Sequence, residues 1–233
     1  MRKIKLTVLR AARSSRVSSL LYASRWRRSR LLILCYHGVA LDDEHRWRPS
    51  LYITPGQLRA RLECLRGENC AVLPLGEAVG RLYAGTLPAR SVVLTFDDGF
   101  HDFYEAAWPI LKEFSLPATV YQTTYYSECD RPVFNLVCDY LLWKSSLPRL
   151  VWPEVIGEPI ALDPEGRRAA VSAIQAHCAR ENLSGGQESG LVQELADRLG
   201  VNPAPILSRR LLHLMNREEL REIAAAGIDI QLH

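Results

Sequence analysis

The stretch that decides the fold is SVVLTFDDGF, residues 91–100. Residues 92–94 are apolar and partly β-branched, which is typical of a buried strand. Asp97 and Asp98 follow at the point where such a strand must leave the core. In parallel α/β folds, the carboxyl ends of the strands are where ligands and chemistry gather. The stretch therefore indicates a candidate site at the end of a strand.

Two interpretations of the acidic pair remain open. Adjacent residues on extended backbone point to opposite sides, so one carboxylate can bind a metal while the other faces a different atom. Alternatively, Asp98-Gly99 is only a turn, because Asp-Gly is a strong signal for a hairpin.

The composition fits one domain with a sizeable core and a basic N-terminal arm. The chain has 233 residues, of which 48% are hydrophobic. Residues 1–30 contain ten Lys or Arg and no acid, which leaves 19 basic against 26 acidic residues and a net charge of −7 from residue 31 onward. An acidic body predicts no nucleic-acid partner. The arm is either an amphipathic helix on an anionic membrane surface or a solvated segment.

Other features point to the cytoplasm. No apolar run is long enough to span a bilayer, and the arm lacks the continuous apolar region of a signal peptide. The six cysteines form no CxxC pair, and we interpret them as reduced core thiols. No histidine-and-acid setting for a nucleophilic cysteine is visible in the sequence. We expect a cytoplasmic protein, with peripheral membrane contact through residues 1–30 as the arm's alternative role.

Strand and helix patterns alternate in the first half of the chain. Strands are predicted at 31–36, 70–75, 91–96 and 117–122, and helices at 54–67, 76–84 and 105–114. This order predicts a parallel sheet or barrel. We place the first part of this body at residues 31–125.

The second half begins with a different pattern. Residues 126–204 read as a mainly helical insertion, which either caps the site or is decoration. Residues 205–233 return to the first pattern, with a capping box at Asn216 and Glu219 and a strand that leads to His233.

Three stretches resemble the polysaccharide deacetylases, also called the chitooligosaccharide-deacetylase homology domain or carbohydrate esterase family 4. Residues 95–99, TFDDG, match the family's first motif. Residues 226–233, AGIDIQLH, look like the strand that delivers its second motif, H-[S/T]-x-x-H, and residues 34–39, LCYHGV, are similar to the opening strand of many members. The resemblance covers residues 31–125 and 205–233. It implies an α/β fold with a distorted, incomplete (β/α) barrel.

The resemblance also implies roles for individual residues. Asp97 would be the general base, and Asp98 and His233 would bind a divalent metal, with Zn²⁺ as the expected ion. The second histidine of the motif would lie four residues further on, so we expect the chain to be truncated inside that motif. His37 either assists substrate binding and proton transfer or is a structural histidine.

This assignment agrees with the chemistry of amide hydrolysis. A zinc-like cation lowers the pKa of bound water and polarises the acyl oxygen, while a separate carboxylate takes the proton. The sequence therefore predicts a metal-dependent hydrolase that removes N-acetyl groups from an amino-sugar carbohydrate. The alternatives are a hydrolase of another non-peptide amide and a non-catalytic fragment that binds carbohydrate or a partner.

The remaining histidines and two of the tryptophans have other expected positions and roles. We expect surface or core positions for His45, His101, His177 and His213. Trp143 and Trp152, in the insertion, are the candidates for stacking against a sugar. The sequence gives no oligomeric state.

Overall fold

The computed structural model describes residues 30–233 with the exception of residue 130. Apart from Arg30, the basic arm predicted over residues 1–30 therefore lies outside the described residues. Within the described part of the chain, no helix combines the length and apolar character needed to cross a membrane.

The centre of the molecule is a five-stranded parallel sheet. Its strands are β1 (Leu32–Tyr36), β4 (Ala71–Val72), β5 (Ser91–Phe96), β6 (Thr119–Gln122) and β9 (Asp229–Leu232). The middle strand is β5, which is buried along its whole length. β1 lies on one side of β5, while β4 and β6 share the other side, β4 at the start of β5 and β6 at its end.

The predicted α/β fold is confirmed by this arrangement. The described strands form an open sheet, because β1 and β9 lie at its two ends and each has a single strand neighbour. A closed barrel is therefore not formed by residues 30–233.

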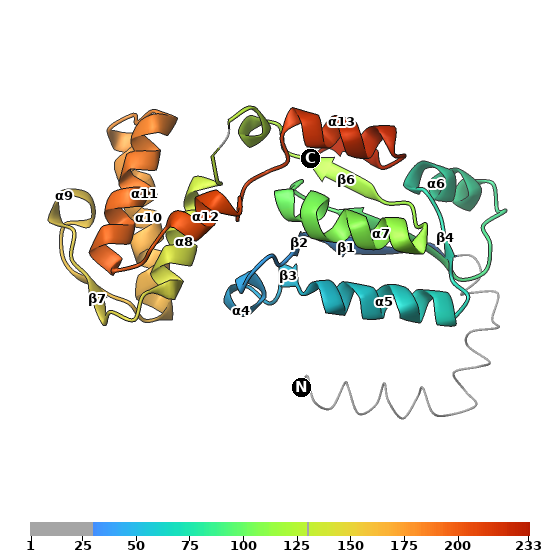
Figure 1. Cartoon of the computed structure of the whole chain (residues 1–233), viewed down its shortest axis with the longest axis horizontal. Coiled ribbons are helices and arrows are strands. Elements are labelled where there is room, and N and C mark those ends of the chain that lie inside the picture. Colours follow the sequence, from blue (N-terminus) through green and yellow to red (C-terminus); the bar gives the residue numbers. More distant parts are fainter. Residues whose placement is uncertain (1–29, 130) are drawn as a thin grey trace, which may run out of the picture.

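Helices cover one face of this sheet. Figure 1 shows α5 (Pro55–Gly67) and α7 (Trp108–Phe114) running along it, with α13 (Arg217–Ala225) beside β6 and α6 (Leu75–Tyr83) near β4. Alternate strand residues point to the helices, since side chains alternate between the two faces of a sheet. The resulting core contains Tyr36, Val92, Leu94, Phe96 and Val120 from the strands together with Leu58, Leu62, Leu111 and Ile223 from the helices.

Local signals in the sequence explain where several helices begin. Thr54 forms the expected capping box with Gln57 at the start of α5. Asn216 and Glu219 form the second capping box at the start of α13. The sequence predicts a kink or a new start at Pro109, and the structure has a π-helical turn, Phe103–Ala107, that gives way to α7 one residue before this proline.

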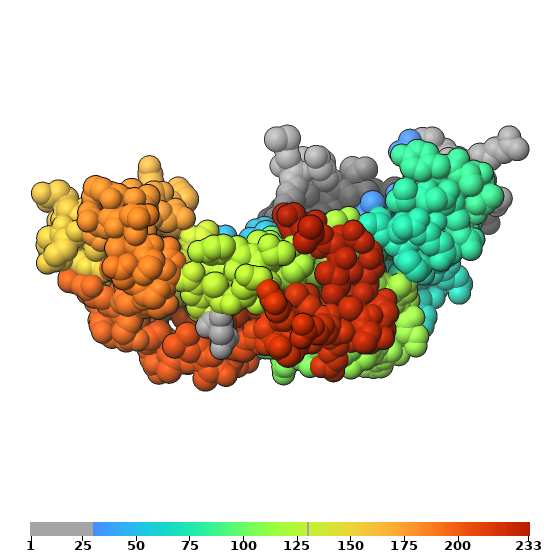
Figure 2. Space-filling model, turned by 90° about the horizontal axis from the view of Figure 1, so that it is seen from above, coloured from blue at the N-terminus to red at the C-terminus, as the bar shows by residue number. Residues whose placement is uncertain are grey.

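Residues 134–208 form a largely helical layer at one end of the molecule (Figures 1 and 2). Its helices are α8 (Phe134–Lys144), α9 (Pro153–Ile156), α10 (Pro164–Arg180), α11 (Gly185–Leu199) and α12 (Ala204–Ser208). A small hairpin within this layer consists of β7 (Arg149–Leu150) and β8 (Ile160–Ala161), which pair antiparallel. The helices share an apolar core of their own, centred on α8.

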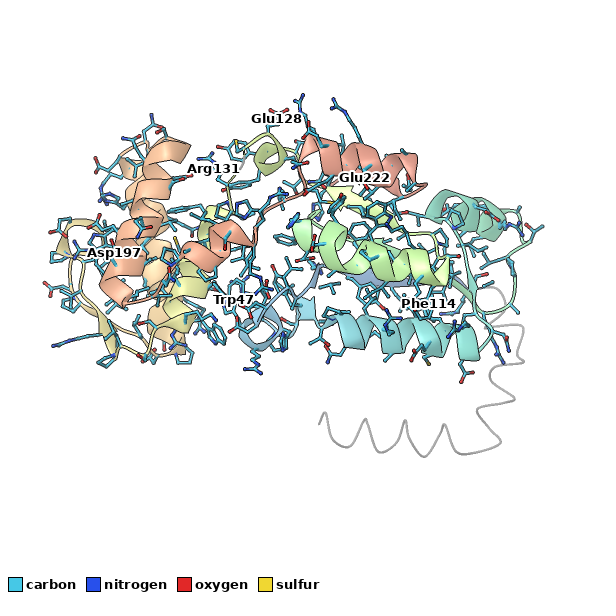
Figure 3. All side chains as sticks on the ribbon, in the orientation of Figure 1. Trp47, Phe114, Glu128, Arg131, Asp197 and Glu222 are labelled. Atoms are coloured by element: carbon cyan, nitrogen blue, oxygen red, sulfur yellow. The ribbon has the colours of Figure 1, made fainter. Side chains whose placement is uncertain are left out.

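Short elements that the sequence did not predict join the two parts. They are β2 (Gly38–Val39), β3 (Tyr52–Ile53) and α4 (Glu44–Trp47), and a 3-10 turn at Tyr125–Glu128 leads toward the helical layer. Trp47, labelled in Figure 3, lies edge-on to Tyr140 of α8 with 5.3 Å between the ring centroids. Asp43 accepts hydrogen bonds from Tyr140 and Lys144 of the same helix.

Candidate functional site

The turn after β5 has a geometry that the sequence did not predict. The strand ends at Phe96, and Asp98 and Gly99 both have left-handed backbone, with φ of +69° and +74°. The expectation that extended backbone separates the two acids is therefore wrong. The chain reverses sharply here instead, and this turn gives Asp97 and Asp98 different neighbours.

Glycine is required in this turn for a second reason. A Cβ atom at position 99 would lie 1.9 Å from Oε1 of Gln122. Gln122 is buried and donates from Nε2 to Ser127 Oγ at 2.7 Å. The turn is thus packed closely against the end of β6.

Asp97 faces the end of β1. Its backbone N–H donates to the carbonyl of Tyr36 at 2.8 Å, which continues the pairing of β1 with β5. The Cys35 thiol donates to Asp97 Oδ2 at 3.0 Å, and His37 Nε2 lies 3.9 Å from the same oxygen. Cys35 and His37 are two residues apart at the end of β1, which is adjacent to β5. Side chains two residues apart on extended backbone point to the same side of a sheet, so both reach Asp97 from that side.

Asp98 faces the end of β9. His233 Nε2 lies 3.6 Å from Asp98 Oδ1, and the backbone N–H of His233 donates to the carbonyl of Gln122 at 3.1 Å. A nitrogen and an oxygen that bind one tetrahedral zinc ion are about 3.4 Å apart. The two side chains therefore fit a shared cation. The side chain of Asp98 is 35% exposed to solvent and that of His233 is 46% exposed.

The structure thus places the four side chains that the sequence selected in two pairs. Asp97 lies with His37, and Asp98 lies with His233. The chemical roles assigned to these four residues remain predictions.

Cys35 is the residue of this site that the sequence analysis missed. The sequence predicts a core thiol here, but the side chain is exposed. It belongs to a group with His37 and Asp97 whose ligand atoms all lie within 4.8 Å of one another. Partial desolvation of the sulfur and the hydrogen bond to Asp97 raise the pKa of Cys35 above its usual range. The spacing Cys35-x-His37 beside a strand that ends in two acids was the available signal.

A buried carboxyl group lies beneath the turn. Asp102 accepts a hydrogen bond from the backbone N–H of Val39 at 3.0 Å. Its other oxygen is so close to Gly38 that a Cβ there would lie 3.0 Å from it. Burial, and to a smaller degree the negative charges of Glu44 and Asp98, raise the pKa of Asp102 well above its usual range. Asp102 therefore ties the start of β2 to the segment that follows the turn.

His101 occupies a buried position, which agrees with the expected surface or core position, and it has defined partners. Its Nδ1 lies 3.0 Å from Glu219 Oε1, and Arg210 contacts both side chains. The backbone N–H of His101 donates to the carbonyl of His213 at 2.9 Å. These contacts attach the turn to the segment before α13.

The predicted sugar-stacking role of Trp152 is contradicted by its burial. Its side chain lies in the core of the helical layer, the residue is 1% exposed, and Nε1 donates to Glu194 at 2.9 Å. Trp143 is partly buried and packs against Tyr140 with 5.8 Å between the ring centroids. No ring face of Trp152 is available to a sugar.

Comparison with known proteins adds independent information. Residues 84–139 match the family model described as polysaccharide deacetylase. The Poly-beta-1,6-N-acetyl-D-glucosamine N-deacetylase of Escherichia coli (strain K12) is 31% identical over 101 residues, which are 43% of this chain and 15% of that enzyme. The enzyme of the same name from Staphylococcus aureus (strain MSSA476) is 34% identical over 67 residues, which are 29% of this chain and 23% of that enzyme.

A solved structure is also similar in part. The Streptococcus pyogenes deacetylase PplD in complex with acetate has 33% identity and a TM-score of 0.39, over 42% of this chain and 44% of that chain. The matched region of the family model contains the TFDDG turn, β5 and β6. Residues 84–139 of this chain are therefore similar to part of a polysaccharide deacetylase domain.

Proposed function

We propose that the chain carries part of the active site of a metal-dependent hydrolase that removes N-acetyl groups from an amino-sugar polysaccharide. The proposal is supported by the family match over residues 84–139 and by the names of the relatives, which are N-deacetylases of poly-beta-1,6-N-acetyl-D-glucosamine. The observation that carries it is the division of the acidic pair: Asp98 lies 3.6 Å from His233, while Asp97 has Cys35 and His37 as neighbours.

Asp98 and His233 are the residues that would hold the metal. Their oxygen and nitrogen donors suit Zn²⁺, which when bound polarises an acyl oxygen and lowers the pKa of water. Both side chains are partly exposed, so substrate and water have access to the space between them.

Asp97 is the proposed general base. Because its neighbours are Cys35 and His37 while His233 lies against Asp98, its carboxylate is available to take a proton from the attacking water. The Cys35 thiol, which donates to Oδ2, holds the carboxylate in one orientation. This leaves Oδ1 of Asp97 as the oxygen for proton transfer.

His37 is proposed to handle the second proton. An amide nitrogen leaves poorly as an anion, so the departing amine needs a proton donor. His37 lies at the same side of the sheet as Asp97, and its side chain is 35% exposed. Its ring can therefore reach a substrate that is bound at the turn.

We also propose that the open sheet is part of a distorted (β/α) barrel. All its strands are parallel, and helices cover one face. Cys35, His37 and Asp97 lie on the other face, where a barrel has its interior. This arrangement would direct the site toward the mouth of the barrel.

A non-catalytic role in carbohydrate binding is the second candidate. Among the described residues, no third histidine, cysteine or acid forms a ligand group with Asp98 and His233. A catalytic zinc site normally has three protein ligands.

The test is release of amine from N-acetylglucosamine oligomers with Zn²⁺ present. We expect Asp97→Asn to lower the rate by a factor of about 10²–10⁴, the usual contribution of a positioned general base. Asp197→Asn, on the exposed face of α11 and labelled in Figure 3, is the control and should leave the rate unchanged. Binding of the oligomer without amine release supports the second candidate, and neither binding nor release refutes both.

A further inference from the structure

We propose that Cys35, His37 and Asp97 form a second cation site, which binds thiophilic divalent ions such as Zn²⁺, Cd²⁺ and Co²⁺. The donors are one sulfur, one imidazole nitrogen and one carboxylate oxygen, all within 4.8 Å of one another. This site is distinct from the pair Asp98 and His233, because it shares no side chain with that pair.

The distances support this site. In a tetrahedral zinc site, sulfur and oxygen ligands lie about 3.6 Å apart, and nitrogen and oxygen ligands about 3.4 Å apart. The corresponding distances here are 3.0 Å from Cys35 Sγ to Asp97 Oδ2 and 3.9 Å from His37 Nε2 to Asp97 Oδ2. Both distances lie close to the values expected for ligands of one ion.

The three side chains are held by neighbouring strands. Cys35 pairs with Thr95 in the register of β1 with β5, and the Asp97 N–H continues that pairing to Tyr36. The backbone positions of the ligands are therefore set by the sheet before a cation arrives. The donors are also accessible, since Cys35 is exposed and the Asp97 side chain is 23% exposed.

The donor set selects the kind of ion. A thiolate and an imidazole favour zinc-like ions over Mg²⁺ and Ca²⁺, which prefer oxygen ligands. On binding, the bond between sulfur and hydrogen breaks, the sulfur–metal bond forms, and the proton goes to solvent. Three protein ligands leave a fourth position for water.

Occupancy of this site has a functional consequence, which rests on the proposed function. An ion bound to Asp97 Oδ2 takes the carboxylate that the proposed reaction uses as its base. Excess Zn²⁺ or Cd²⁺ would then inhibit deacetylation while the cation at Asp98 and His233 stays in place.

The test is a titration of the purified chain with Co²⁺, followed by absorption spectroscopy. A cysteine ligand gives a thiolate-to-cobalt charge-transfer band in the near ultraviolet, so this readout needs no catalytic activity. We expect the band in the wild-type chain and expect its loss in Cys35→Ser. It should weaken in His37→Ala and Asp97→Asn, each of which removes one further ligand.

Two variants serve as controls. Cys64→Ser removes another exposed thiol, which lies on α5, and should keep the band. Asp98→Asn removes a ligand of the other proposed site and should also keep it. The proposal is overturned if the wild-type chain shows no band, if Cys35→Ser retains it, or if Cys64→Ser abolishes it.

Discussion

The carboxyl ends of the central strands and the core of the helical layer differ in how far their side chains are exposed to solvent. At the ends of β1, β5 and β9, the side chains of Cys35, His37, Asp97, Asp98 and His233 all remain at least partly exposed. The helical layer also contains side chains that could stack on a ligand or react. These are Trp152, Cys138 and Cys178, and all three are buried in an apolar core. The difference locates the proposed chemistry in the sheet and assigns the helical core to stability.

The largest expected effect tests the stability role of the helical layer. Trp152→Ala removes a side chain that is fully buried, and we expect a loss of about 3–5 kcal/mol in the free energy of unfolding. Val151→Ala is the matched control, because the neighbouring Val151 is 46% exposed and should lose under about 0.5 kcal/mol. Urea denaturation measures both. Equal losses for the two variants would show that this core does not stabilise the protein.

A pair of glycines should respond with opposite signs. Gly99→Ala forces a side chain into left-handed backbone and against Gln122, which we expect to cost about 1–3 kcal/mol. Gly190→Ala, within α11 and with no atom close to the new Cβ, should stabilise by about 0.5–1 kcal/mol. Thermal denaturation of the two variants compares the regions directly. A stabilising Gly99→Ala would contradict the geometry of the turn.

The junction between the two regions depends on Asp43. Burial raises the pKa of this carboxyl, but its hydrogen bonds from Lys144 and Tyr140 outweigh that effect and lower the pKa on balance. Asp43→Asn should cost about 1–2 kcal/mol at neutral pH. Because the folded-state pKa is lowered, the wild-type advantage should be present above the unfolded value and disappear as the pH falls through the folded value. Denaturation at several pH values checks this, and a cost that is independent of pH would contradict it.

Asp102 should show the opposite dependence of stability on pH. Its replacement should change the free energy of unfolding least at acidic pH. Its folded-state pKa is raised by burial, so the wild-type chain loses stability as the pH rises above the unfolded value of about 3.9. Asp102→Asn cannot ionise and should gain stability relative to the wild type as the pH rises. The difference is measured by denaturation between acidic and neutral pH. A constant difference across that range would show that Asp102 is not buried as described.

Local signals predicted the parts of the fold that depend on nearby residues. The capping boxes at Thr54 and Asn216 satisfy backbone groups within one turn, and both are present. The alternation of strands and helices was sufficient to predict a parallel sheet. The family match over residues 84–139 was predicted from TFDDG.

Features that depend on residues far apart in the chain were missed. Cys35 meets Asp97 only because β1 pairs with β5 in one particular register. His101 is oriented by Glu219, which is distant in sequence. The burial of Trp152 depends on the packing of the helical layer, which no local pattern around residue 152 specifies.

The central claim is that the two adjacent acids have separate roles, and zinc binding at His233 tests it most directly. The measurement is a Zn²⁺ titration in a Cys35→Ser background, which removes the thiolate site, with the imidazole resonances of His233 followed by nuclear magnetic resonance. We predict that Zn²⁺ shifts these resonances, that adding Asp97→Asn preserves the shift, and that adding Asp98→Asn abolishes it. If Asp98→Asn preserves the shift and Asp97→Asn abolishes it, the assignment of the two acids is contradicted.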